Sequence, residues 1–281
     1  MVITINNGNL TFANYSGNRP IGEVLAGVYG NFNSNAFSAF LTAIGGTEGT
    51  IWSKIQRLYM PLFSNGSDNS LFFDVKSLSV KAYSGYNVSD ISAAWTFASD
   101  VNHSNLKGYK GVKISDNSGN LAIPLEGVTN KNVCVFSINT YDELPSSSLN
   151  ITEVSEVGEE GTSLHTATVR STTAVLRVVD NADSSYYGSA TKSTQGFDIT
   201  DCCVQFNDGT NTGIKSNRGN SSKANEYIEC TLGAFYLACR HQFNHDSFSR
   251  LVSLQGVAKG LTESEAQTLE TALEGLVAVY S

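Results

Sequence analysis

The sequence is poor in charged residues and has no cluster of positive charge. Charged side chains make up 16% of the 281 residues, against about 25% in an average globular domain. The 18 Lys and Arg residues are scattered, and 26 Asp and Glu residues bring the net charge to −8. A nucleic-acid-binding surface needs a basic stripe that displaces phosphate counterions. We therefore expect no nucleic acid among the partners of this chain.

The sequence also lacks a long hydrophobic run. No stretch approaches the ~20 apolar residues that span a bilayer, and residues 1–7 contain no basic segment of the kind that opens a signal peptide. Cysteine is sparse and odd in number, and its five positions show no paired spacing. We expect no membrane partner, and mostly buried, reduced thiols as in a protein made in a cytosol.

Signatures of catalysis are missing as well. A glycosidase places two carboxylates over one sugar, and on a strand this requires even spacing. The local acidic pairs, such as Glu226 and Glu229 or Asp198 and Asp201, are three residues apart, which predicts opposite faces. No Gly-x-Ser-x-Gly elbow, phosphate-binding loop or dinucleotide fingerprint occurs. We predict no catalytic residue and no cofactor; a glycosidase with carboxylates from distant strands stays open.

No motif predicts a metal site. His241 and His245 have the spacing of a zinc-protease helix, but Gln242 stands where a general base is needed, between two strand-like runs. The turns at residues 116–120 and 207–213 contain oxygen ligands suited to calcium, yet too few carboxylates for tight binding. Turn chemistry explains both segments, and we expect no bound metal.

What the sequence has in abundance is β-structure. Between about residue 58 and about residue 258, apolar runs alternate with clusters of Asn, Asp, Gly and Ser. Successive strands without intervening helices indicate antiparallel pairing, and hence a sandwich or a barrel. Residues 142–165 look like a solvated loop or strand edge. The apolar runs lie at residues 71–73, 93–97, 133–138, 173–179, 203–206 and 235–239.

Helices are predicted on either side of this β region. A first helix, capped at residue 34 or 35 and stopped by Gly45-Gly46, carries the apolar stripe Phe37, Phe40, Leu41 and Ile44. A second carries Ile51, Trp52, Ile55 and Leu58, after which Pro61 should force an extended chain. Ahead of both, an Asn7-Gly8 turn signal predicts a hairpin or an extended arm.

The C-terminal helix has the clearest local signal. Thr262 and Glu265 form a capping box, in which each side chain satisfies a backbone N–H of the other residue. The helix has a single apolar stripe, made of Ala266, Leu269, Leu273, Leu276 and Tyr280. We expect this stripe to dock on the sandwich; packing against another subunit is the alternative.

Two blocks of the sequence are similar to a known family. The first, Trp52-Ser53-Lys54-Ile55-Gln56-Arg57-Leu58-Tyr59-Met60-Pro61-Leu62-Phe63, resembles the helix-to-strand entry of tailed-bacteriophage virion proteins with a concanavalin-like (laminin-G-like) jelly-roll domain. Trp95-Thr96-Phe97, His103-Ser104 and Gly111-Val112 then follow in the family's order. The second block, Gly260-Leu261-Thr262-Glu263-Ser264-Glu265-Ala266, resembles the family's C-terminal plan.

The resemblance implies a mainly β fold: an antiparallel jelly-roll β-sandwich over residues 46–281, with a C-terminal helix and an N-terminal arm or helical anchor over residues 1–45. It also implies a non-enzymatic structural component of a bacteriophage virion, such as a head fibre, capsid decoration or tail appendage, assembled in the bacterial cytoplasm. Its partners would be other virion proteins, and closed cyclic appendages favour a homotrimer. The candidate anchor residues are Phe37, Phe40 and Leu41.

A second hypothesis is a glycan-binding, lectin-like module that recognises a bacterial surface polysaccharide. Tyr83, Tyr86, Tyr186 and Tyr187 stand beside Gly and Ser in polar segments. There, an aromatic face with a hydrogen-bonding tip suits stacking on sugars. Tyr is also enriched at protein interfaces. We therefore keep these four residues as candidate glycan or interface contacts.

Overall fold

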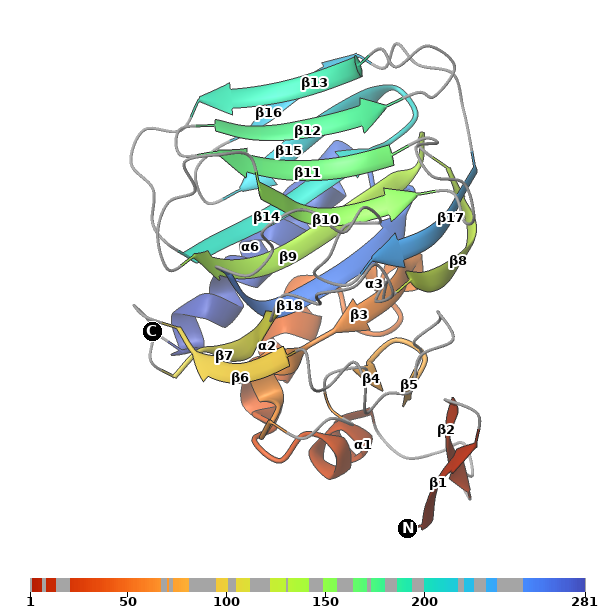
Figure 1. Cartoon of the computed structure of the whole chain (residues 1–281), viewed down its shortest axis with the longest axis vertical. Helices are drawn as coiled ribbons and strands as arrows, with labels where there is room; N and C mark the ends of the chain where they lie inside the picture. The colour runs from red at the N-terminus through yellow and green to blue at the C-terminus, as the bar shows by residue number, and fades with distance from the viewer. Residues whose placement is uncertain are drawn as a thin grey trace.

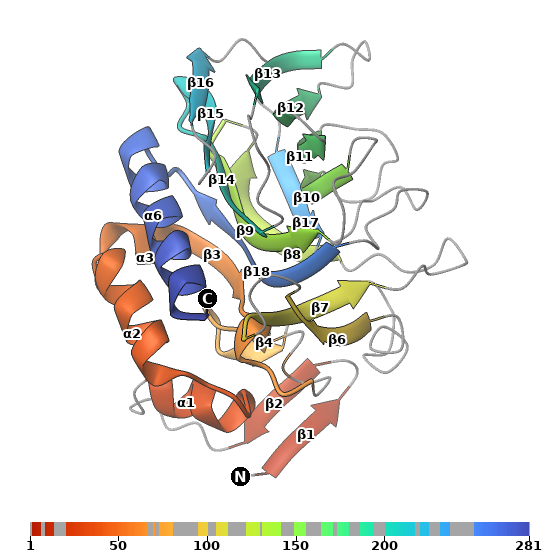
Figure 2. The ribbon, with the colours of Figure 1, turned by 90° about the vertical axis from the view of Figure 1, so that its left-hand side faces the viewer.

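The chain folds into a layered antiparallel β-sandwich with helices on one side (Figure 1). Most strands belong to a 12-stranded sheet, which we call sheet A, and a 6-stranded sheet, which we call sheet B. In Figure 2 the helices cover one face of sheet A, and sheet B lies over its other face. The computed structural model describes residues 2–6, 9–13, 21–66, 70, 73–80, 95–100, 105–111, 122–129, 131–141, 149–155, 164–170, 173–179, 186–193, 200–216, 220–224, 231–236 and 250–280.

Sheet A begins with an N-terminal hairpin and contains the longest strand, near the C-terminus. In spatial order its strands are β1 (Val2–Asn6), β2 (Asn9–Ala13), β5 (Ser79–Val80), β4 (Phe73–Asp74), β3 (Ile55–Tyr59), β18 (Arg250–Lys259), β9 (Val133–Tyr141), β14 (Thr200–Asn207), β15 (Asn211–Ser216) and β16 (Ser221–Ala224). Two further strands, β7 (Lys107–Gly111) and β6 (Trp95–Ser99), extend from β18. The centre of this sheet, made of β3, β18, β9 and β14, pairs strands that are far apart in sequence.

Sheet B comes mainly from the middle of the chain. Its spatial order is β13 (Tyr186–Ser193), β12 (Thr173–Val179), β11 (Leu164–Arg170), β10 (Leu149–Ser155), β17 (Thr231–Tyr236) and β8 (Ala122–Thr129). Every strand pair that the structure describes in the two sheets is antiparallel. The fold is thus the jelly-roll β-sandwich of the predicted class.

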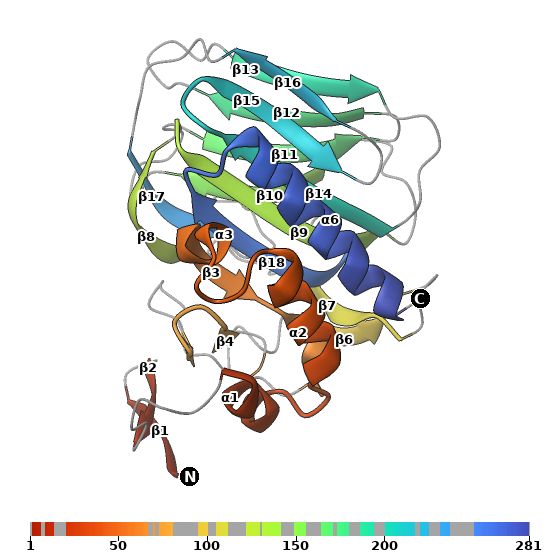
Figure 3. The same cartoon turned by 180° about the vertical axis from the view of Figure 1, so that it is seen from behind.

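The helices come from the two ends of the described chain. They are α1 (Ile21–Val28), α2 (Ser34–Ala43), α3 (Thr50–Lys54), the 3-10 helix η1 (Pro61–Phe63) and α6 (Glu263–Tyr280). Figure 3 shows α6 lying across sheet A, with α2 beside it. None of the helices in the described ranges combines the length and apolar character needed to cross a membrane.

The main hydrophobic core fills the space between sheet A and the helices. Alternate residues of β9, β14 and β18 face α6, among them Phe136, Val204 and Leu254, each at most 1% exposed. Opposite them lies the apolar stripe of α6, in which Leu269 and Leu273 are fully buried. The prediction that this stripe docks on the sandwich is confirmed. Burying a Leu contributes about 1.5–3 kcal/mol, so this layer is a major source of stability.

Several local predictions are confirmed. The first helix begins at Ser34 and ends before Gly45 and Gly46, which adopt positive φ. Its cap is Asn33 rather than the predicted Ser34 or Asn35, because the Asn33 side chain accepts the Ala36 N–H at 3.0 Å. The N-terminal segment is a hairpin in which Ile3 pairs with Phe12 and Ile5 with Leu10. The run at residues 173–179 forms β12 with the same bounds.

Other boundaries were wrong. The helix expected over residues 51–58 ends at Lys54, and β3 begins at Ile55 because its backbone pairs with β18. Pro61 starts the η1 turn rather than an extended segment. Residues 235 and 236 of the predicted run at 235–239 belong to β17, which begins earlier, at Thr231, and residues 237–239 lie outside the described residues. The segment 142–165, expected as a loop or strand edge, contains β10, which pairs on both sides.

The three residues predicted as a virion anchor have an internal role instead. Phe37 and Phe40 are each 2% exposed within the hydrophobic core, and Leu41 packs against that core. Both α1 and α2 contribute to the same core as the sandwich. An apolar stripe requires a partner, and here the partner is the rest of the chain, so the buried Phe37 and Phe40 side chains are not available to another protein.

Candidate functional site

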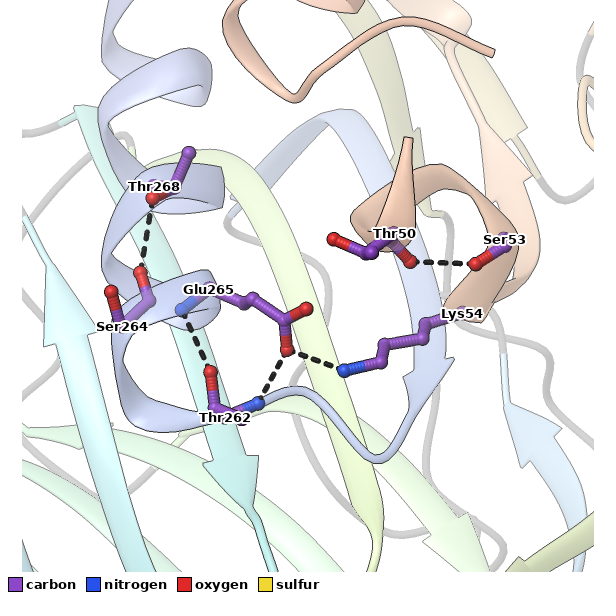
Figure 4. Close-up of polar contacts among 7 residues, drawn as sticks. All are labelled: Thr50, Ser53, Lys54, Thr262, Ser264, Glu265 and Thr268. Carbon is purple, nitrogen blue, oxygen red and sulfur yellow. Dashed lines mark hydrogen bonds and ion pairs between the residues drawn. The ribbon is translucent and has the colours of Figure 1, made fainter. Parts of the chain in front are cut away.

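The two blocks that resemble phage virion proteins meet in space. β3, in the first block, pairs antiparallel with β18, matching Leu58 to Gly256 and Tyr59 to Gln255. β18 then turns through Gly260, at φ 68°, into α6. We call this region, comprising α3, β3, the end of β18 and the first turn of α6, the terminal joint (Figure 4).

A single carboxylate connects the two parts of the joint. Glu265 Oε2 accepts the Thr262 N–H at 2.8 Å, while Thr262 Oγ1 accepts the Glu265 N–H at 3.2 Å, as the predicted capping box requires. The same Glu265 oxygen lies 2.5 Å from Lys54 Nζ of α3. Figure 4 shows both contacts converging on this side chain. Glu265 therefore caps α6 and ties it to α3.

The electrostatics of the joint favour the ionised carboxylate. Burial alone would raise the pKa of Glu265, but hydrogen bonds from Lys54 and Thr262, together with the charge of Lys54, hold its pKa below the ordinary value. The two side chains are 30% and 19% exposed, so solvent screens the ion pair. The joint is consequently a structural tie, not a reactive acid.

A second carboxylate organises the chain next to the joint. Asp74 is fully buried and accepts the backbone N–H groups of Leu58 and Lys76, both at 3.0 Å, and the Ser77 hydroxyl at 2.7 Å. Lys76 Nζ donates to the Trp52 carbonyl at 2.6 Å and lies 4.7 Å from the centre of the Trp52 ring. Burial lowers the pKa of Lys76, and the Asp74 charge opposes that shift.

The face of sheet A toward sheet B is unusually polar. We call Ser137, Asn139, Gln205, Ser253 and Gln255 the inter-sheet polar stripe; all are at most 2% exposed. Asn139 Nδ2 donates to Ser137 Oγ at 2.7 Å. However, Asn139 Oδ1, Gln205 Oε1 and Ser253 Oγ have no hydrogen-bond partner. Such atoms are acceptors for water or hydroxyl groups, and leaving each one dry costs about 1–3 kcal/mol.

The strand register of sheet B defines a row of polar residues across five strands. Glu153 pairs with Tyr236 and Thr166, Thr166 with Arg177, and Arg177 with Ser189. Directly paired residues share one face of a sheet. We call this set of paired residues the polar row.

The predicted tyrosines are only partly placed. Tyr83 and Tyr86 lie outside the described residues. Tyr186 pairs with Val179, and Tyr187 with Val178, as successive residues of β13. Successive strand residues belong to opposite faces, so these two cannot act as one contact surface.

Sequence reasoning missed the polar row because its members come from five separate strands. The pairing order that aligns them is visible only in the sheet. Each strand alone reads as an ordinary mixture of Thr, Ser, Val and one charge. No signal in the sequence could have located this row.

The candidate calcium turn is explained by its backbone. Asn207 Oδ1 accepts the Gly209 N–H, and Asp208 Oδ1 accepts the N–H groups of Thr210 and Asn211. These oxygens serve the turn, as turn chemistry predicts. No group of three metal-ligating side chains occurs within the described residues. His241 and His245 lie outside them.

Comparison with known proteins supports the fold alone. No protein-family model matches the sequence, and no curated protein matches it. Among solved structures, the Trypanosoma rangeli sialidase with 2,3-difluoro-KDN gives a TM-score of 0.53 at 11% identity, over 86% of this chain and 39% of the sialidase. Its complex with 2,3-difluorosialic acid gives 0.51 at 12% identity, with the same coverage.

A third similar structure is domain 4 of AbnA, a GH43 extracellular arabinanase from Geobacillus stearothermophilus, in complex with arabinotriose. It gives a TM-score of 0.49 at 10% identity, over 77% of this chain and 98% of that domain. This chain spans about two fifths of the length of the sialidase that it resembles. At these identities, the sialidase similarity establishes a shared β-sandwich and nothing about activity.

Proposed function

We propose that this chain is a non-enzymatic structural component of a bacteriophage virion, placed in a head fibre, capsid decoration or tail appendage. The supporting observation is the terminal joint. The two blocks that resemble virion proteins contribute Lys54 and Glu265, which are 211 positions apart and joined by one ion pair. The two blocks that resemble virion proteins form one structural unit in the fold. This supports the proposal more strongly than two unconnected resemblances would, because the terminal joint needs both blocks.

The state of the buried reactive groups favours a non-enzymatic role. The buried carboxylates among the described residues are all engaged: Asp74 with backbone N–H groups, Asp100 with Thr140, and Glu270 with Gln267. Burial also raises the pKa of the Cys134 thiol, with the Glu265 charge adding to the shift. A protonated, enclosed thiol is a poor nucleophile. These groups stabilise the fold and offer no acid, base or nucleophile to a substrate.

The proposal places the chain in the particle, with other virion proteins and copies of itself as partners. Its test is the composition of phage particles purified from the strain that encodes the chain. Quantitative peptide mass spectrometry should detect the chain in a fixed ratio to the capsid protein, and deletion of its gene should remove an appendage or decoration seen by electron microscopy. Particles that lack the chain altogether would refute the proposal.

A matched truncation separates assembly from folding. Residues 21–45 belong to the core, so removing residues 1–45 would unfold the module. Removing residues 1–20 leaves that core complete and should give the same thermal unfolding transition as the full chain. Equal incorporation of the full and shortened chains would show that the segment 1–20 contributes nothing to attachment.

A second candidate function is glycan recognition, and the polar row favours it. The strand register aligns Tyr236, Glu153 and Arg177 in one row across sheet B. An aromatic residue and charged hydrogen-bonding residues suit a polyhydroxylated ligand. The test is a panel of bacterial polysaccharides. We expect Arg177→Ala and Tyr236→Ala to lose binding, whereas Thr268→Ala, on the exposed side of α6, should keep it. No binding by the unaltered chain would reject this candidate.

A further inference from the structure

The N-terminal hairpin ends sheet A with an open edge. β1 pairs with β2 on one side, and no described strand pairs with its other side. Among the described residues, β2 is joined to the rest of the sheet through one residue pair, Leu10 of β2 with Val80 of β5. Figures 1 and 3 show the hairpin standing away from the body of the molecule. Its outer backbone N–H and C=O groups are therefore a template for another strand.

Natural proteins usually protect such an edge with Lys, Pro or a bulge. β1, Val2–Asn6, has none of these, and its register with β2 runs without a shift. Residues 1–18 contain no Asp, Glu, Lys or Arg, although the whole chain carries a net charge of −8. Two copies that approach through their hairpins bring together segments without charged side chains, so the repulsion between two acidic chains is not concentrated at this contact. This electrostatic contrast favours a second copy as the occupant of the edge.

The strand is also complementary to itself. An antiparallel pair centred on Thr4 places Ile3 opposite Ile5, and Val2 opposite Asn6. Within each hairpin, Ile3 and Ile5 already share a face with Phe12 and Leu10. The two-fold pair would join both apolar faces into one continuous surface, as an isologous contact requires.

We infer that β1 pairs with β1 of a second copy of this chain, antiparallel and centred on Thr4. The contact is small compared with a standard interface of about 1,600 Å². Its dissociation constant is therefore expected in the micromolar to millimolar range, and a high local concentration in a particle would strengthen it. The two-fold contact differs from the homotrimer expected from cyclic appendages.

The test uses opposite charges at the centre of the pair. In sedimentation equilibrium of the full chain at low salt, up to about 1 mM, the unaltered protein should dimerise. Thr4→Lys and Thr4→Glu each place like charges face to face and should weaken dimerisation about fivefold or more. A 1:1 mixture of the two variants should restore association at least to the original level. Thr11→Lys adds the same charge to β2, one strand further from the two-fold axis, and should leave the dimer largely intact.

The outcomes are decisive whether or not the protein belongs to a virion. A monomer at every concentration overturns the inference, and so does a dimer that ignores both Thr4 variants. Failure of the mixture to associate, or equal weakening by Thr11→Lys, also overturns it. Unchanged thermal unfolding of each variant confirms that the hairpin change has not disturbed the core.

Discussion

The two faces of sheet A are covered by different layers and contain different side chains. Toward the helices, β9 and β14 place Phe136, Ile138, Val204 and Phe206, all essentially buried against α6. Toward sheet B, the same two strands place the alternate residues, which include Ser137, Asn139 and Gln205. Both faces are enclosed, and along these two strands the first is the more apolar, although Thr140 lies on the same face of β9 as Phe136 and Ile138.

The difference shows where the stability of the module resides. The helix-facing layer gains the transfer free energy of close-packed apolar groups. The inter-sheet layer buries polar side chains of β9, β14 and β18, among them Asn139, Gln205 and Ser253, and burying a polar group offsets part of the gain from apolar burial. We therefore predict that sheet A and the helices form the more stable part of the module, and that sheet B opens from it first.

The largest effect is expected from Phe136→Ala. Phe136 is 1% exposed in the centre of the helix-facing layer, and its removal leaves a cavity that the surrounding strands cannot fill. We expect the free energy of unfolding to fall by about 3–5 kcal/mol. Urea denaturation followed by circular dichroism measures it, and a loss below about 1 kcal/mol would contradict this description of the core.

A smaller loss is expected from Gly256→Ala. A Cβ at this position would lie 2.2 Å from Phe136 Cζ and 2.8 Å from the Arg57 carbonyl oxygen, so the ring or the strand must move. We expect a cost of about 1–3 kcal/mol. Gly275→Ala in α6 is the matched control, because a Cβ there meets nothing within 4 Å; it should stabilise the helix by up to about 1 kcal/mol. Equal effects of the two substitutions would mean that Gly256 is not a close-contact position.

Two successive residues of β14 compare the faces directly. Val204→Thr puts a hydroxyl into the helix-facing layer and should destabilise the chain by about 1–3 kcal/mol. Gln205→Met removes an amide whose Oε1 has no partner and whose Nε2 makes only a 3.7 Å contact with Cys203 Sγ. This change should be neutral or stabilising within about 1 kcal/mol. The comparison fails if Gln205→Met proves the more harmful substitution.

The smallest effect concerns the terminal joint and depends on pH. The pKa of Glu265 is lowered in the folded state, so its contribution is present above the unfolded pKa and is lost as pH falls through the folded pKa. Glu265→Gln should lower stability by about 0.5–1 kcal/mol at neutral pH. The difference in Tm from the unaltered chain should shrink as pH falls below the ordinary pKa of a Glu side chain, and should vanish once the carboxyl of the folded state is protonated. Glu274→Gln, on the exposed side of α6, should show no such dependence; a constant difference for Glu265→Gln would exclude the ion pair as its cause.

The sequence predicted the elements whose signals are local. The Thr262–Glu265 capping box, the Gly45-Gly46 stop and the Asn7-Gly8 hairpin each depend on neighbours within a few positions, and each is found. The end of α3 was missed because β3 is enclosed between layers. Ile55, Leu58 and Tyr59 are all buried there, which hides the alternation expected of a strand.

The partners of apolar and polar surfaces were harder to predict. The stripe of Phe37 and Phe40 indicates a buried face, but nothing local distinguishes burial within the chain from burial against another protein. The inter-sheet polar stripe and the polar row arise from strands that are not consecutive in sequence, such as β18 and β14 on either side of β9, or β17 beside β10. Residues such as Gln205 and Arg177 therefore gain their neighbours only through the sheet topology.

Hydrogen–deuterium exchange of the intact chain, read by mass spectrometry peptide by peptide, tests the central claim most directly. The account predicts that β9, β14, β18 and α6 exchange only with global unfolding, while β10, β11, β12 and β13 exchange earlier through partial opening. Equal protection in both sheets, or earlier exchange in α6 and β14 than in sheet B, would contradict it.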